Sequence, residues 1–125
     1  MVAPVTVSPD RIFAMTDKIV ILCTCSGAEE AERLARSLVE ARLAACVNVI
    51  PQVRSYYRWE GALESAEEHL LAIKSSRPLF EALRAHLTGL HSYHLPEILA
   101  LPVVDGSEDY LGWLDASLRH PAEPA

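Results

Sequence analysis

The stretch from Ser55 to Leu63 reads Ser-Tyr-Tyr-Arg-Trp-Glu-Gly-Ala-Leu, which is typical of an aromatic strand that runs into a tight turn. Glu60 and Gly61 predict that turn, because a tight hairpin needs a positive φ that glycine adopts readily. The segment from Glu67 to Ser75 predicts the returning strand. A ribbon of this length is more than the core of one small domain needs. We therefore expect the ribbon to pack on another copy of the chain.

The composition limits the classes of function that the chain can serve. It has 125 residues, half of them hydrophobic, which fits a single domain with one packed core. The formal net charge is −6 and there is no cluster of Lys and Arg, so we expect no nucleic-acid partner. No apolar run approaches the ~20 residues that a membrane-spanning helix needs, so we expect no membrane partner either.

The ends of the chain predict flexible segments around one domain. The apolar part of the N-terminus contains two prolines and its first arginine, Arg11, follows that part, which disagrees with a signal peptide. We expect a flexible extension at residues 1–16, a domain at residues 17–119 and a flexible tail at residues 120–125. An odd number of cysteines (Cys23, Cys25 and Cys46) without an export signal favours reduced thiols and a cytoplasmic location.

The order of elements predicts two consecutive βαβ halves. Strands are expected at Lys18–Cys25, Ala44–Trp59, Glu67–Ser75 and Glu97–Val103, and helices after Ser26, after Ser76 and after Ser107. Ser26 and Glu29 have the spacing of a capping box, and Pro51 is expected at a bulge or a sheet edge. The first strand is apolar almost throughout, which predicts burial on both of its faces.

These elements predict an α/β fold of the α+β sandwich type, the ferredoxin-like split βαβ arrangement, with a long hairpin and an extra C-terminal helix. Right-handed crossovers place the first strand between the third and the fourth, and the second strand at an edge. The fourth strand then runs antiparallel to the first. The loop from His91 to His94, which leads into the fourth strand, is therefore expected near Cys23 and Cys25.

Cys23 and Cys25 are candidate metal ligands because alternate residues of a strand share a face. Cys25 also precedes a helix N-terminus, which is expected to lower the pKa of its thiol. A Cys with one or two His, such as His91 and His94, suits Cu(I) or Zn(II). The alternative is that the cysteines pack as small hydrophobic residues, as we expect for Cys46.

Other histidines and aromatic residues carry weaker signals. His69 and His86 have no partner at ligand spacing in the sequence. The aromatic side chains predict interface and core packing, with a ligand-stacking pocket as the alternative. They are Tyr56, Tyr57, Trp59, Tyr93, Tyr110 and Trp113. No credible pair of nucleophile and base and no phosphate-binding loop is present, so we expect that the chain is not an enzyme.

Several segments in order resemble one known family. They are Leu43–Pro51, Ser55–Glu64, Glu68–Lys74, His91–Ile98 and Leu101–Leu114. The chain is similar over residues 18–119 to the CutA divalent-cation-tolerance family, and the Trp-Glu-Gly turn is the most specific of the shared motifs. The resemblance implies a stable homotrimer with a fold like that of the PII signalling proteins.

The same resemblance implies a response to divalent metal ions. In bacterial members this link is assigned to one cysteine and a pair of histidines. By position the cysteine is Cys23 and the second histidine is His91, while Leu90 stands where the first would be. The first hypothesis is therefore a trimeric tolerance protein that binds copper, or zinc or another divalent cation, weakly at Cys23 and His91. Cys25 and His94 are further candidates from the residues themselves and not from the resemblance.

A second hypothesis is a metal-independent, PII-like sensor or trimeric scaffold that binds a small ligand, such as an anionic metabolite, between subunits. The long regulatory loop of PII proteins is missing, because the turn after Trp59 is tight. PII-type nucleotide signalling is therefore disfavoured.

Overall fold

The computed structural model describes residues 16–123. The predicted flexible extension, residues 1–16, lies outside this range apart from Thr16. The predicted tail is described as far as Glu123, whose amide donates to the carbonyl oxygen of His120 at 3.0 Å and closes a turn.

The elements are β1 (Lys18–Cys25), α2 (Ala28–Glu40), β2 (Cys46–Trp59), β3 (Ala62–Ser76), the 3-10 helix η1 (Arg77–Leu79), α3 (Phe80–Leu90), β4 (Leu99–Pro102) and α4 (Glu108–Ser117).

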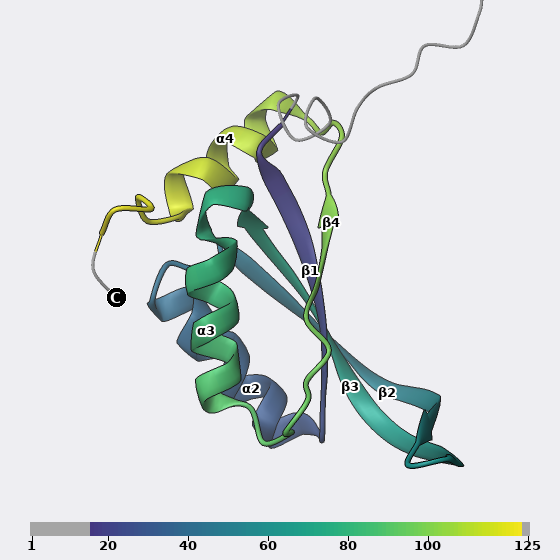
Figure 1. Ribbon diagram of the computed structural model, residues 1–125. Coiled ribbons are helices and arrows are strands. Elements are labelled where there is room, and N and C mark those ends of the chain that lie inside the picture. The colour runs from purple at the N-terminus through teal and green to yellow at the C-terminus, as the bar shows by residue number, and fades with distance from the viewer. Residues whose placement is uncertain (1–15, 124–125) are drawn as a thin grey trace, which may run out of the picture.

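The sheet has the predicted strand order. Its four strands follow one another as β2-β3-β1-β4, and every neighbouring pair is antiparallel. Helices α2 and α3 lie on one face of the sheet, and α4 lies at the end where β1 begins (Figure 1). This is an α+β fold, and the predicted position of β1 between β3 and β4 is confirmed.

The core lies between the sheet and the helices. From β1, Ile19, Ile21 and Cys23 are fully buried toward the helices, and Leu71 and Ile73 of β3 join them. The intervening residues of β1 are only half-buried. The prediction that this strand is buried on both faces is therefore right for one face only, since within this protomer the helices cover just one side of the sheet.

The hairpin between β2 and β3 is longer than predicted. Its turn has two residues with positive φ, Glu60 at 50° and Gly61 at 81°, which is the backbone that a tight hairpin requires. The register shifts between Ile50 and Val53, so the expected bulge at Pro51 is confirmed. The outer half of the hairpin projects past the helices (Figure 1), and β3 starts at Ala62 instead of Glu67.

The start of α2 differs from the prediction. Gly27 is the N-cap residue and makes no side-chain capping bond. The backbone amide and the hydroxyl of Ser26 instead donate to Oε1 of Glu30, at 3.0 and 2.9 Å. Glu29 is exposed, whereas Glu30 points into the protein. At α4 the predicted cap is confirmed, because the hydroxyl of Ser107 accepts from the Tyr110 amide at 3.3 Å.

Candidate functional site

His91 lies at the end of α3 and packs against the C-terminal end of β1. Its side chain is fully buried. Nε2 donates to the carbonyl oxygen of Thr24 at 2.9 Å, and Nδ1 accepts from the backbone amide of Tyr93 at 3.0 Å. A carbonyl can only accept and an amide N–H can only donate, so the ring is the neutral tautomer with its proton on Nε2. Both ring nitrogens are therefore occupied.

Glu30 holds the loop after His91 against α2. It is 6% exposed. Its Oε2 accepts from the backbone amide of Ser92 at 2.7 Å and from the Arg33 guanidinium at 3.2 Å. Desolvation by burial raises the pKa of Glu30, but the hydrogen bonds from Ser26 and Ser92 outweigh it and lower the pKa to about 2. Glu30 is thus an ionised anchor between the helix and the loop.

Tyr93 extends this connection to β3. Its phenol donates to Oε2 of Glu68 at 2.8 Å, and Glu68 is only 7% exposed. Desolvation and the hydrogen bond to Glu68 raise the pKa of Tyr93. The Tyr93 ring also packs on the His91 ring, with centroids 4.7 Å apart. The start of the loop is therefore held by two buried carboxylates, Glu30 at Ser92 and Glu68 at Tyr93.

The two strand cysteines are both fully buried toward the helices. Burial, and next the neighbouring Cys25, raise the pKa of the Cys23 thiol to about 12. Burial also raises the pKa of Cys25, although the Gly27 backbone works in the opposite direction. The predicted lowering of the Cys25 pKa is therefore wrong, because desolvation dominates over the start of the helix. Both residues are thiols at neutral pH in this structure.

The structure brings only some of the predicted metal ligands close together. The structure brings Cys23 and His91 to the same end of β1, since His91 bonds to the residue after Cys23. His94 is exposed, and Cys46 is only half-buried although we expected it in the core. Among residues 16–123, no group of three or more His, Cys, Asp or Glu residues could hold a metal ion. With both nitrogens of His91 in use, the pair does not fit a resident metal in this conformation.

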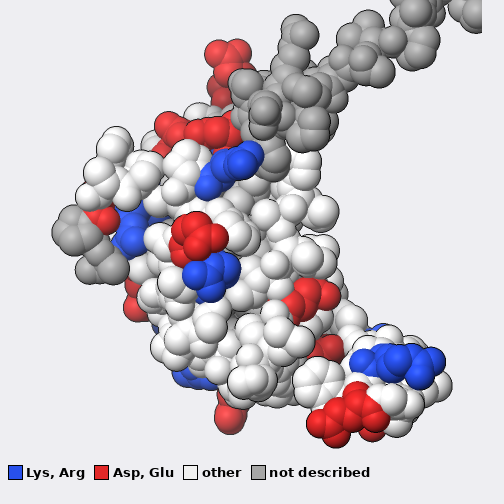
Figure 2. Space-filling model, viewed as in Figure 1, with Lys and Arg blue, Asp and Glu red and all other residues white. Residues whose placement is uncertain are grey.

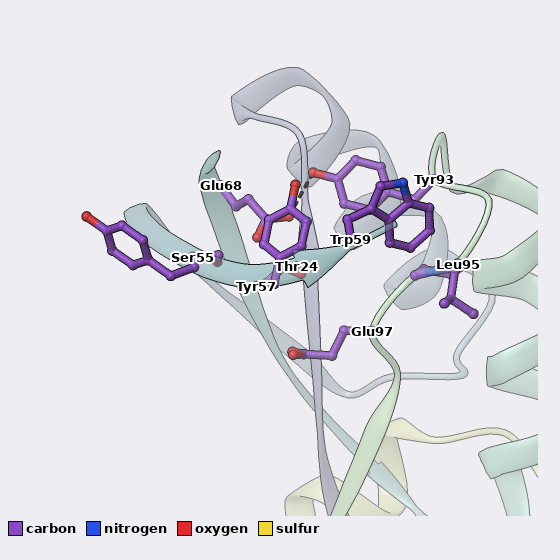
Figure 3. Close-up of a pocket in the computed structure, with 10 residues that line it drawn as sticks. Thr24, Ser55, Tyr57, Trp59, Glu68, Tyr93, Leu95 and Glu97 are labelled. Atoms are coloured by element: carbon purple, nitrogen blue, oxygen red, sulfur yellow. Dashed lines mark hydrogen bonds between the residues drawn. The ribbon is translucent and has the colours of Figure 1, made fainter. Parts of the chain in front are cut away.

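A cleft opens on the sheet face that the helices do not cover. Its volume is about 740 Å³, which is within the range of small-molecule sites. Figure 3 shows Trp59 and Tyr57 of β2, Glu68 of β3 and Tyr93 around it, with the Tyr93–Glu68 hydrogen bond at its wall. The lining residues are Thr24, Ser55, Tyr56, Tyr57, Trp59, Glu68, Tyr93, Leu95, Pro96 and Glu97.

The roles of Glu30 and Glu68 at this end of the sheet were not predicted from the sequence. Glu68 belongs to a run of acidic residues near the hairpin that is typical of a solvated strand end. The sequence did contain one indication of this role. Residues of a strand alternate between its two faces, which places Glu68 on the face of β3 opposite to Leu71. The described residues that line the cleft include two carboxylates and no Lys or Arg, so the cleft favours a neutral or cationic ligand over an anion.

Charged side chains of both signs are spread over the visible surface. On the face shown in Figure 2, acidic and basic side chains are scattered, and the basic ones do not form a continuous patch. Within residues 16–123, no helix is long and apolar enough to cross a membrane.

Comparisons with known proteins agree with the resemblance seen in the sequence. A family model described as CutA1 divalent ion tolerance protein matches residues 19–117. A divalent-cation tolerance protein CutA from Pectobacterium atrosepticum is 51% identical over 105 residues, which cover 84% of this chain and 96% of that protein. The chloroplastic protein CutA of Arabidopsis thaliana is 44% identical over 102 residues, which cover 82% of this chain and 56% of that protein.

A solved structure supports the same assignment. The divalent cation tolerance protein of Thermus thermophilus superposes with a TM-score of 0.80 at 41% sequence identity, covering 82% of this chain and 99% of that one. These proteins are described by tolerance and not by a catalysed reaction, in agreement with the prediction that the chain is not an enzyme. The chain belongs to the CutA1 divalent ion tolerance protein family.

Proposed function

We propose that this protein acts in divalent-cation tolerance as a homotrimer that binds copper, or a related divalent cation, weakly at Cys23 and His91. The observation that carries the proposal is membership of the tolerance family, with a relative at 51% identity that is named for this function. The cation is cargo here. The nearness of Cys23 to the carbonyl group that His91 holds supports these two residues as the binding pair.

The surroundings of the pair explain why binding is weak. The Cys23 thiol must lose its proton to become a good ligand, and its pKa of about 12 opposes this at neutral pH. His91 must also give up one hydrogen bond, either to Thr24 or from Tyr93. The net contribution of one hydrogen bond is about 0.5–1.5 kcal/mol, and losing it makes the free energy of cation binding less favourable by that amount.

The exposed hairpin supports self-association. Tyr56 is 70% exposed, Leu63 is 77% exposed and Trp59 is 46% exposed, all on the part of the hairpin that projects from the protomer. Among residues 16–123, the outer edges of β2 and β4 also have no neighbouring strand in the sheet. Exposed aromatic side chains and open strand edges are covered together when copies of a chain close into a ring.

Titration of the reduced protein with Cu(I), in competition with a coloured chelator, tests the cation site. We expect saturable binding that is lost in both Cys23→Ser and His91→Ala, and kept in the exposed-histidine control His94→Ala. A circular-dichroism spectrum of each variant checks that the fold is intact. Equal affinity in wild type and in both site variants would rule out this pair.

The cleft supports a second candidate, metal-independent binding of a small ligand. The aromatic rings of Trp59 and Tyr57 and the carboxylate of Glu97 line one continuous space with Tyr93. Aromatic faces with nearby carboxylates attract organic cations. A thermal-shift screen of cationic, neutral and anionic metabolites in the presence of a chelator tests it. We expect stabilisation by a cationic or neutral compound that disappears in Trp59→Ala, and no stabilisation by any compound would exclude it.

We also propose that the protein works in the cytoplasm. The three cysteines are free thiols in the structure, which suits a reducing compartment. Relatives differ in location, because the Arabidopsis protein is named chloroplastic. Fractionation of the native cells, followed by detection with an antibody, tests this directly.

A further inference from the structure

Cys25 and His69 lie directly opposite each other on neighbouring strands. The register of β1 and β3 pairs Cys25 with His69. Directly opposed residues in an antiparallel pair point to the same face, with Cβ atoms about 4.5–5.5 Å apart. That face is the one that carries Cys23 and Leu71 toward the helices. A thiol and an imidazole therefore lie on neighbouring strands at the same end of the buried side of the sheet.

The imidazole of His69 has a nitrogen with no assigned role. Its Nδ1 is buried and makes no hydrogen bond within residues 16–123. Buried polar atoms are nearly always paired, so this nitrogen has a lone pair that is available to an ion. The Cys25 sulfur is also weakly engaged, with its contact to the Gly27 carbonyl oxygen at 3.8 Å. His91 differs, because both of its nitrogens are already bonded.

We propose that Cys25 and His69 form a two-ligand site for a soft cation such as Cu(I), separate from the Cys23–His91 pair. Thiolate sulfur and imidazole nitrogen are the ligands that Cu(I) prefers. On binding, the Cys25 S–H bond is replaced by a sulfur–metal bond and the proton is released to solvent. The His69 Nδ1 lone pair supplies the second bond, and no oxidant or reductant is needed.

The surroundings of the pair suit a cation. Glu30 and Glu68 act electrostatically on the Cys25 thiol, while Arg33 acts in the opposite direction. The two carboxylates disfavour an uncompensated thiolate, but they favour a positive ion bound to it. Cys25 is fully buried, whereas His69 is half-buried as a residue with its Nδ1 atom on the buried side.

Chelator competition with Cu(I) on the reduced, full-length protein tests this site. We expect that Cys25→Ser and His69→Val each lower the affinity for one equivalent of Cu(I) by about tenfold or more. The affinity of the double variant should be close to that of either single variant. The matched controls Cys46→Ser and His94→Ala keep this equivalent. Wild-type affinity in His69→Val would overturn the proposal.

Nitrogen NMR of the wild-type protein gives a measurement that does not depend on a variant folding. We expect Cu(I) to shift the Nδ1 resonance of His69 at one molar equivalent, and an unmoved resonance at saturation would overturn the site.

Failure of the proposed Cys23–His91 site can be distinguished from failure of the Cys25–His69 site. If Cys23→Ser and His91→Ala leave this equivalent intact while Cys25→Ser removes it, the Cys25–His69 site stands without the other.

Discussion

The Nε2 nitrogen of His91 donates to the carbonyl oxygen of Thr24 at 2.9 Å, across the gap between the end of α3 and the end of β1. This bond joins the loop before β4 to the strand that carries Cys23. The same ring accepts from the Tyr93 amide through Nδ1. The histidine that the family resemblance assigns to metal binding therefore also holds the loop in place, and the two roles compete for the same nitrogen atoms.

Replacement of His91 measures the structural part of this role. His91→Ala removes a buried ring and leaves the Thr24 carbonyl and the Tyr93 amide without this partner, so we expect a loss of about 2–4 kcal/mol in the free energy of unfolding. His94→Ala, at an exposed position three residues on, is expected to change it by less than about 0.5 kcal/mol. Urea unfolding at one fixed protein concentration compares the two. Similar stability of both variants would contradict the anchoring role.

Tyr93→Phe tests the bond to the buried carboxylate. The variant keeps the ring but removes the donor to Glu68, so we expect a loss of about 1–2 kcal/mol. Tyr56→Phe is the matched control, because Tyr56 is 70% exposed. Thermal unfolding followed by circular dichroism measures both changes. Equal melting temperatures for the two variants would show that the Tyr93 phenol does not stabilise the fold.

Glu30 predicts a specific acid dependence of stability. Its pKa in the fold is about 2, below its ordinary value of 4.5. A lowered pKa means that the ionised group stabilises the fold above about pH 4.5, and that this contribution is lost as the pH falls from 4.5 toward 2. The contribution is on the order of 3 kcal/mol. In Glu30→Gln the stability should change less with pH across this window, whereas exposed Glu29→Gln should follow wild type.

Trp59 tests the assembly. The side chain lies on the projecting hairpin and is 46% exposed in the protomer, so we expect Trp59→Ala to weaken association more than it weakens the protomer fold. Sedimentation velocity over a range of dilutions should show wild type at three times the 13.8 kDa mass of one chain and the variant dissociating. An intact trimer of the variant at the lowest concentration would argue against a hairpin interface.

The fold was predictable because its signals are local and periodic. The apolar runs of β1 and β3 and the Glu60–Gly61 turn identify the strands, and right-handed crossovers then fix their order. The position of His91 near Cys23 followed from that order alone. The outer half of β3 was missed, since residues Ala62 to Ala66 show no apolar alternation in a ribbon whose outer part is exposed.

The details of the site depend on register and on side-chain direction, which the sequence does not display. Glu29 has the spacing of a capping residue if Ser26 is the N-cap. The N-cap is Gly27 instead, so Glu30 is the third helical residue and reaches back to the Ser26 amide. His69 has no partner at ligand spacing in the sequence, and its position opposite Cys25 comes from the pairing of two distant strands. The raised pKa of the Cys25 thiol likewise reflects burial that a motif does not reveal.

The state of the His91 ring during Cu(I) titration shows whether the nitrogen atoms that hold the loop also bind the cation. Nitrogen NMR of the reduced protein reports the two ring nitrogens separately. We expect the neutral tautomer with its proton on Nε2 before Cu(I) is added, and a shift of one His91 nitrogen as Cu(I) binds and the loop bond is released. A His91 spectrum that stays unchanged while the protein saturates with Cu(I) would contradict it.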